Sequence, residues 1–121
     1  MREILLVGTG GFIGAALRYI ASTWLSQFTR FGFHLGIFAV NFIGSTLLGI
    51  FVGLGLGKTT TLPLREFAAI GLSGGFTTFS AFGLESFEML HAGQFKMTAI
   101  YVLGSIVLGI SSIGLGILIT R

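Results

Sequence analysis

Four long apolar segments, joined by short polar connections, constrain this chain more than any other feature of its sequence. They cover about residues 4–25, 33–56, 67–90 and 97–119, and each reaches the roughly 20 residues that a helix needs to cross a bilayer. The apolar runs are continuous, and each is about twice the length of a barrel strand. The sequence therefore predicts an all-α membrane protein whose residues 1–121 form a single domain of four transmembrane helices.

The composition excludes most other classes of protein. Of 121 residues, 53% are hydrophobic and only 9% are charged, too few charges for the surface of a small soluble domain and too many apolar groups for a disordered one. The chain has no cysteine, and its polar residues offer no nucleophile with a base and no metal-ligand cluster, so we expect no enzyme. A net charge of +3, spread along the chain, gives no nucleic-acid patch, and the short connections suggest no soluble partner.

The basic residues give only a weak orientation signal. Four spans place both termini on one side of the membrane, and Lys/Arg asymmetry sets which side that is. That side would carry four basic residues, Arg2, Lys58, Arg65 and Arg121. The other side would carry Arg30 and Lys96, and also Arg18 if it lies near enough to the membrane surface. We hypothesise that the chain inserts both ways and pairs with an inverted copy of itself.

Glycine is unusually abundant, with twenty copies in the chain. Several lie four residues apart, as do Gly10 and Gly14 or Gly71 and Gly75. Small residues at this spacing let helices approach closely in a membrane, so we expect tight packing within a subunit and between subunits.

The third apolar segment contains a poor helix sequence. Gly74 and Gly75 are followed, after Phe76, by Thr77 and Thr78, which predicts a helix broken near Gly74–Thr78; a simple kink is the alternative. The end of the first half-helix would direct carbonyls at the break, which suits a cation. The second half-helix would offer N–H groups, and Thr77, Thr78 and Ser80 would add hydroxyls.

Phe79 and Phe82 follow the break on one helical face. Such pairs usually face lipid or a core, but the positive edge of a phenyl ring can also face an anion. A weak anion site of this kind suits conduction, because the ion must both enter and leave.

Three further spans carry polar candidates. Asn41 can bond across a helix interface or serve a functional site. Arg18 either extends toward the membrane surface or attracts anions at a pore mouth. Tyr101 and Ser105, spaced by four, form a possible polar track along the last helix.

At these residues the sequence resembles the small fluoride channels of the Fluc type, also called the CrcB family. The resemblance covers essentially the whole chain and is strongest at residues 74–82, with Glu85 following. The matching segments are GGFIGA at 10–15, LRY at 17–19, VNFIG at 40–44 and GGFTTFSAF at 74–82.

The resemblance implies a passive fluoride exporter in a prokaryotic plasma (inner) membrane. It implies an antiparallel, dual-topology homodimer in the lipid bilayer with two pores and a central structural sodium ion. The sodium would be held by backbone carbonyls of Gly74 and Thr77. Fluoride would meet the ring edges of Phe79 and Phe82, and Asn41 would donate its amide hydrogens to the ion.

Further positions match by the same resemblance. Tyr101 and Ser105 correspond to a polar track, Arg18 to an arginine near the channel entrance, and Glu85 to an acidic residue in that region. Two positions depart from the pattern, since Gly109 replaces a third hydroxyl and Ile37 a frequent threonine. The polar lining would then be thinner, or Ser112 would substitute.

Two other functions compete with a channel. A proton-coupled drug exporter would also be short and four-helical, but it needs an acidic residue within the membrane, and Glu85 and Glu88 come late in the third segment. A non-transporting accessory subunit, held through its glycine faces, would give no ion flux alone.

Overall fold

Helices make up all the elements in the part of the chain that the computed structural model describes, residues 1–29, 32–56 and 63–121. Four helical stretches are long and apolar enough to cross a membrane, which confirms the predicted all-α membrane architecture. Arg30 and Lys58 of the predicted charge balance lie outside the described residues. The elements are α1 (Arg2–Ser26), α2 (Leu35–Phe51), the π-helical η1 (Val52–Leu56) and η2 (Arg65–Leu72), α3 (Ser73–Phe76), α4 (Phe79–His91) and α5 (Phe95–Thr120).

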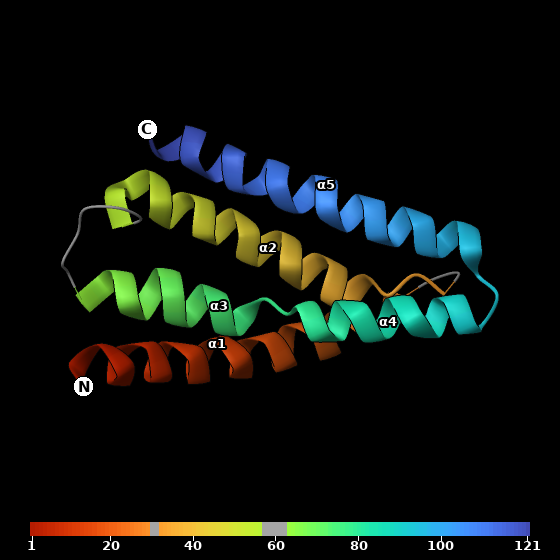
Figure 1. Cartoon of the computed structure of the whole chain (residues 1–121), viewed down its shortest axis with the longest axis horizontal. Coiled ribbons are helices and arrows are strands. Elements are labelled where there is room, and N and C mark those ends of the chain that lie inside the picture. The colour runs from red at the N-terminus through yellow and green to blue at the C-terminus, as the bar shows by residue number, and fades with distance from the viewer. Residues whose placement is uncertain (30–31, 57–62) are drawn as a thin grey trace.

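The helices run alongside one another, and both termini lie at the same end of the molecule (Figure 1). The most extensive packing joins α2 to α5, and α1 to η2 and α3. Helix α4 packs on α5 and less extensively on α2. The second span begins two residues later than predicted, because His34 has non-helical dihedral angles and precedes α2 as its N-cap.

Glycines bring α1 against the third span. A β-carbon on Gly14 would collide with the backbone of α3, and one on Gly75 would collide with the backbone of Gly11. Gly10 and Gly71 approach each other in the same way. These glycines therefore pack helices within one subunit, as small residues do in membranes.

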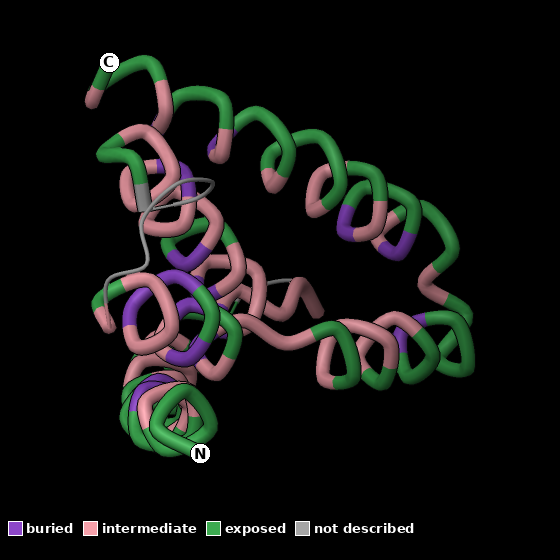
Figure 2. The backbone as a smooth tube through the Cα atoms, turned by 60° about the vertical axis from the view of Figure 1, so that its left-hand side comes forward, coloured by how far each residue is buried: buried purple, intermediate pink, exposed green. Residues whose placement is uncertain are grey.

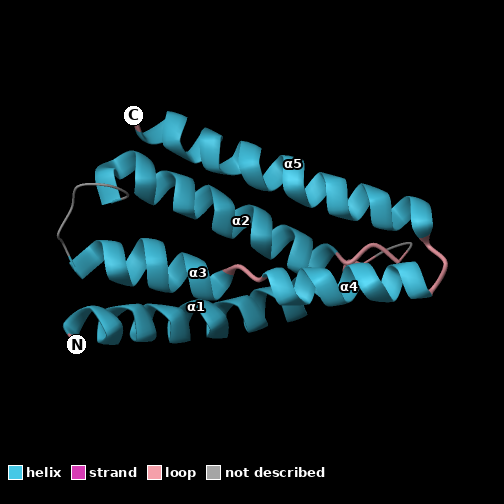
Figure 3. Cartoon of the chain, in the orientation of Figure 1, coloured by secondary structure: helices cyan, strands magenta, loops and turns pink. Residues whose placement is uncertain are grey.

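The third span is interrupted between α3 and α4. Gly74 and Gly75 remain helical, whereas Thr77 and Thr78 have extended backbone, with ψ angles of 156° and 126°. The Ser73 carbonyl accepts both the N–H and the hydroxyl of Thr77, each at 3.0 Å. Figure 3 shows the resulting non-helical connection between the two helices.

The interior of a single chain is small. Its buried apolar side chains are Val40, Ala68, Ala69, Phe76, Met89 and Tyr101. Figure 2 shows that the outward faces of the helices are largely exposed, and many of the exposed side chains are large and apolar. Surfaces of this kind are typical of contact with lipid or with another subunit.

Candidate functional site

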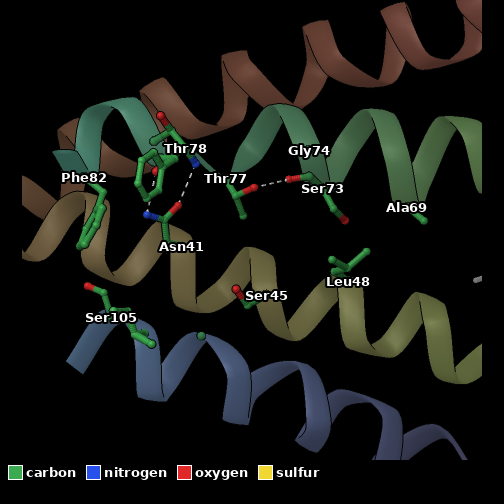
Figure 4. A pocket seen from close by; sticks show the side chains of 13 residues that line it. Asn41, Ser45, Leu48, Ala69, Ser73, Gly74, Thr77, Thr78, Phe82 and Ser105 are labelled. Carbon is green, nitrogen blue, oxygen red and sulfur yellow. Dashed lines mark hydrogen bonds between the residues drawn. The ribbon is translucent and has the colours of Figure 1, made fainter. Parts of the chain in front are cut away.

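A cavity of about 370 Å³ lies beside the interruption of the third span. Three helices surround it: α2, α5 and the third span (Figure 4). Most of the predicted site residues line it, namely Asn41, Gly74, Thr77, Thr78, Phe79, Phe82 and Ser105. The remaining lining residues are Ser45, Leu48, Ala69, Ser73, Ile106 and Gly109.

Asn41 pairs with the backbone at the interruption. Its Nδ2 donates to the Thr78 carbonyl at 3.0 Å, and its Oδ1 accepts from the Thr78 N–H at 2.8 Å. In a continuous helix that N–H would donate to the Gly74 carbonyl. The amide therefore ends the helical bonding of α3, and one of its two amide hydrogens is left for another acceptor.

Thr78 also begins α4. As the N-cap, its hydroxyl accepts from the Ala81 N–H at 3.3 Å and lies 3.2 Å from the Ser80 hydroxyl. Ser80 is exposed and is not a lining residue of the cavity. The Thr78 hydroxyl thus stabilises the start of α4, as Ser and Thr commonly do at this position.

The two phenylalanines after the interruption lie together. The ring centroids of Phe79 and Phe82 are 5.6 Å apart, and the Phe82 ring stacks on Tyr101 at 5.5 Å. Phe79 is 82% exposed in the single chain, whereas Tyr101 is fully buried. The rings of Phe79, Phe82 and Tyr101 therefore form a row from an exposed face of the molecule to its interior.

The last span gives the cavity one hydroxyl without a partner. The buried Ser105 Oγ has no hydrogen-bond partner among the described residues. Gly109 also lines the cavity and adds no hydroxyl. Ser112 does not replace it, because the Ser112 hydroxyl donates to the Leu108 carbonyl of its own helix and is not a lining residue.

Arg18 reaches the interruption. Its half-buried guanidinium donates from Nη1 to the Thr77 carbonyl at 3.3 Å. This carbonyl is one of the two backbone groups that, by the family resemblance, would hold a sodium ion. A cationic side chain at the end of α3 matches the partial negative charge expected there.

Glu85 has a partner on each carboxylate oxygen. The Tyr101 hydroxyl donates to Oε2 at 2.5 Å, and His34 Nδ1 lies 3.7 Å from Oε1. Tyr101 is not itself a lining residue, but its ring covers Phe82. The Glu85 carboxylate thus lies outside the cavity lining, near the N-terminal end of α2.

Sequence reasoning missed several of these residues. Ser45 lies one helical turn after Asn41, and that spacing could have identified it as a second polar group on the same face. His34 lies in a connection far along the chain from Glu85, and no pattern in the sequence indicates their contact. Ser73 is distinguished only by its place before the glycine pair.

A family model described as "CrcB-like protein, Camphor Resistance (CrcB)" matches residues 5–117. The chain belongs to the CrcB-like family. The matched residues, 5–117, include the interrupted third span and every residue that lines the cavity.

Relatives of this CrcB-like chain share its full length. A protein of Parabacteroides distasonis named fluoride-specific ion channel FluC is 39% identical over 121 residues, which cover 100% of this chain and 94% of the relative. Proteins of the same name are 36% identical in Agrobacterium fabrum, covering 100% and 98%, and 40% identical in Prosthecochloris aestuarii, covering 98% and 92%. These relatives are named as ion channels and not as enzymes.

Proposed function

We propose that this chain is a passive, fluoride-selective channel that exports fluoride across a prokaryotic plasma (inner) membrane. Full-length similarity to proteins named fluoride-specific ion channels supports this function. The observation that carries it at the site is the buried Ser105 hydroxyl, which has no hydrogen-bond partner within residues 1–29, 32–56 and 63–121 and lines the same cavity as Asn41 and Phe82.

The chemistry of the cavity suits a small anion that holds its water strongly. Such an ion crosses only if other donors replace its hydration shell. Ser105 offers a hydroxyl, Asn41 retains one amide hydrogen, and the edges of Phe79 and Phe82 are weakly positive. Because none of these groups carries a full charge, fluoride can bind here and leave again.

A second, inverted copy would complete the pathway. Phe79 lines the cavity yet is 82% exposed, so a single chain leaves this ring without cover. Gly74 is exposed as well, and a β-carbon there would meet no atom within 4 Å. An antiparallel, dual-topology homodimer would bury both positions and give two fluoride pores, one for each copy.

The central sodium ion belongs to the same proposal. Backbone carbonyls at the end of a half-helix are suitable ligands for a hard cation, and the pairing of Asn41 with Thr78 removes the usual donor of the Gly74 carbonyl. Gly74 and Thr77 of each copy would hold the ion, which would offset the negative ends of two α3 helices. Arg18 already donates to the Thr77 carbonyl and would share that oxygen with the ion.

Ion efflux from liposomes that contain only the purified protein tests this function. A fluoride electrode should record fast fluoride release, and a parallel chloride trace should match that of protein-free liposomes. Absence of fluoride release from folded, dimeric protein would favour an accessory subunit. Proton-driven movement of organic cations would instead favour a drug exporter.

Replacing sodium with a large organic cation tests the ion at the dimer centre. The proposal expects the dimer to dissociate at a lower temperature in sodium-free solution. An unchanged dissociation temperature would remove sodium from the proposal and leave the fluoride pathway standing.

A further inference from the structure

His34, Glu85 and Tyr101 form a cluster at the beginning of α2. His34 Nδ1 lies 3.7 Å from Glu85 Oε1, and the Tyr101 hydroxyl donates to Glu85 Oε2 at 2.5 Å. The His34 ring also makes an edge contact with Tyr101, with 6.4 Å between centroids. The His34 side chain is 33% exposed and that of Glu85 only 18%.

This cluster continues the row of groups that lines the cavity. Phe82 lines the cavity, Tyr101 stacks on Phe82, and Tyr101 bonds Glu85. His34 is the outermost member, since it precedes the first residue of α2. An anion that moves along this row therefore passes close to the Glu85 carboxylate, whose negative charge would repel it.

We propose that His34 is a positioning residue for fluoride conduction, which holds Glu85 against Tyr101 and offsets its charge when the imidazole is protonated. The inference rests on the proposed channel function and assigns a role to a residue outside the cavity. The distance of 3.7 Å is too long for a hydrogen bond from a neutral imidazole. At this distance a protonated imidazole attracts the Glu85 carboxylate through its charge.

The charged neighbours of His34 determine the sign of the pH effect. From α4 it faces Glu85, and Glu88 places a second acidic charge near Glu85. From α5 it faces the phenol of Tyr101. Within the described part of the chain, Glu85 is the one charged group within 4 Å of His34. Raising the pH removes the positive charge and leaves the acidic charge unbalanced, so fluoride flux should fall.

The test is fluoride efflux at about pH 6 and about pH 8, equal on both sides of the liposome, since histidine changes its charge in this range. Wild-type flux should be about three- to tenfold faster at the lower pH. In His34→Gln the fluoride flux should be slow at both pH values. In His34→Lys, whose positive charge is fixed, the flux should be fast at both pH values. Protein-free liposomes correct for leakage of hydrogen fluoride.

Two further variants separate the charge effect from a loss of structure. His91→Gln alters the other histidine, which is exposed and stacks on Phe87, and it should keep the wild-type pH dependence. Glu85→Gln removes the charge that His34 offsets, so it should abolish the pH dependence while His34 remains.

The outcomes distinguish this inference from the function on which it rests. If the wild type releases fluoride but His34→Gln keeps the wild-type ratio between the two pH values, the role of His34 is wrong and the channel stands. If the folded, dimeric wild type releases no fluoride at either pH, both the channel and the role of His34 are wrong.

Discussion

The side-chain amide of Asn41 takes the place of a backbone partner for Thr78. In a continuous helix the Thr78 N–H would bond one turn back, but here Asn41 satisfies both the N–H and the carbonyl of this residue. A buried backbone group without a partner is costly. The interruption is therefore maintained from a neighbouring helix, and not by Gly74 and Gly75 alone.

Asn41→Asp tests this pairing. The aspartate can still accept from the Thr78 N–H, but it cannot donate to the Thr78 carbonyl and it adds a negative charge to the cavity. We expect a loss of about 1–3 kcal/mol in stability and a strong loss of fluoride flux, measured by thermal unfolding in detergent and by liposome efflux.

Thr46→Ala is the matched control for Asn41→Asp. The Thr46 hydroxyl donates to the Phe42 carbonyl of its own helix at 2.9 Å, and its removal should change stability by about 0.5 kcal/mol or less. Equal stability and flux in the two variants would contradict the role given to Asn41.

Individual residues also mark the limit of what the sequence could predict. Asn41 stood out as a polar residue in an apolar segment, but its partner Thr78 depends on how two helices pack. The contact between His34 and Glu85 likewise joins distant parts of the chain. Pairings of this kind come from tertiary structure, which the local pattern of one sequence does not encode.

Among the helices, α1 packs closely against the third span up to α3, where the interruption begins. Gly14 and Gly75 allow the two backbones to touch. The four apolar spans were predictable because their hydropathy is a local property. The sequence predicts the interruption near Gly74–Thr78; in the structure the helix continues through both glycines, of which Gly75 packs against α1, and ends at Phe76.

A pair of glycine variants in α1 tests this packing. Gly14→Ala places a methyl group against the backbone of α3 and should cost about 1–3 kcal/mol. Gly8→Ala, with no atom within 4 Å of the added carbon, should be neutral or slightly stabilising. Thermal unfolding in detergent measures both, and equal effects would mean that α1 packs differently.

The proposed insertion in two orientations can be tested from the two ends of the molecule. Both termini lie at one end (Figure 1), and the connection after α1 lies at the other. The chain has no native cysteine, so introduced cysteines can report on orientation without interference.

Labelling of two single-cysteine variants tests dual topology. Gln27→Cys and Arg121→Cys place the thiol at opposite ends of the molecule. A membrane-impermeant reagent applied to intact cells should label about half of the copies of each variant. Complete labelling of one variant and none of the other would show a single orientation and exclude the antiparallel dimer.

The variant Phe82→Ile tests whether fluoride passes through the cavity beside the interrupted span, as the proposed function requires. Phe82 lines this cavity, whereas Phe87 on the same helix is 65% exposed and is not a lining residue. Fluoride efflux should fall by roughly tenfold or more in Phe82→Ile, because the ring edge is lost, and should stay at the wild-type rate in Phe87→Ile. Wild-type flux from a folded, dimeric Phe82→Ile protein would show that the Phe82 ring takes no part in fluoride passage.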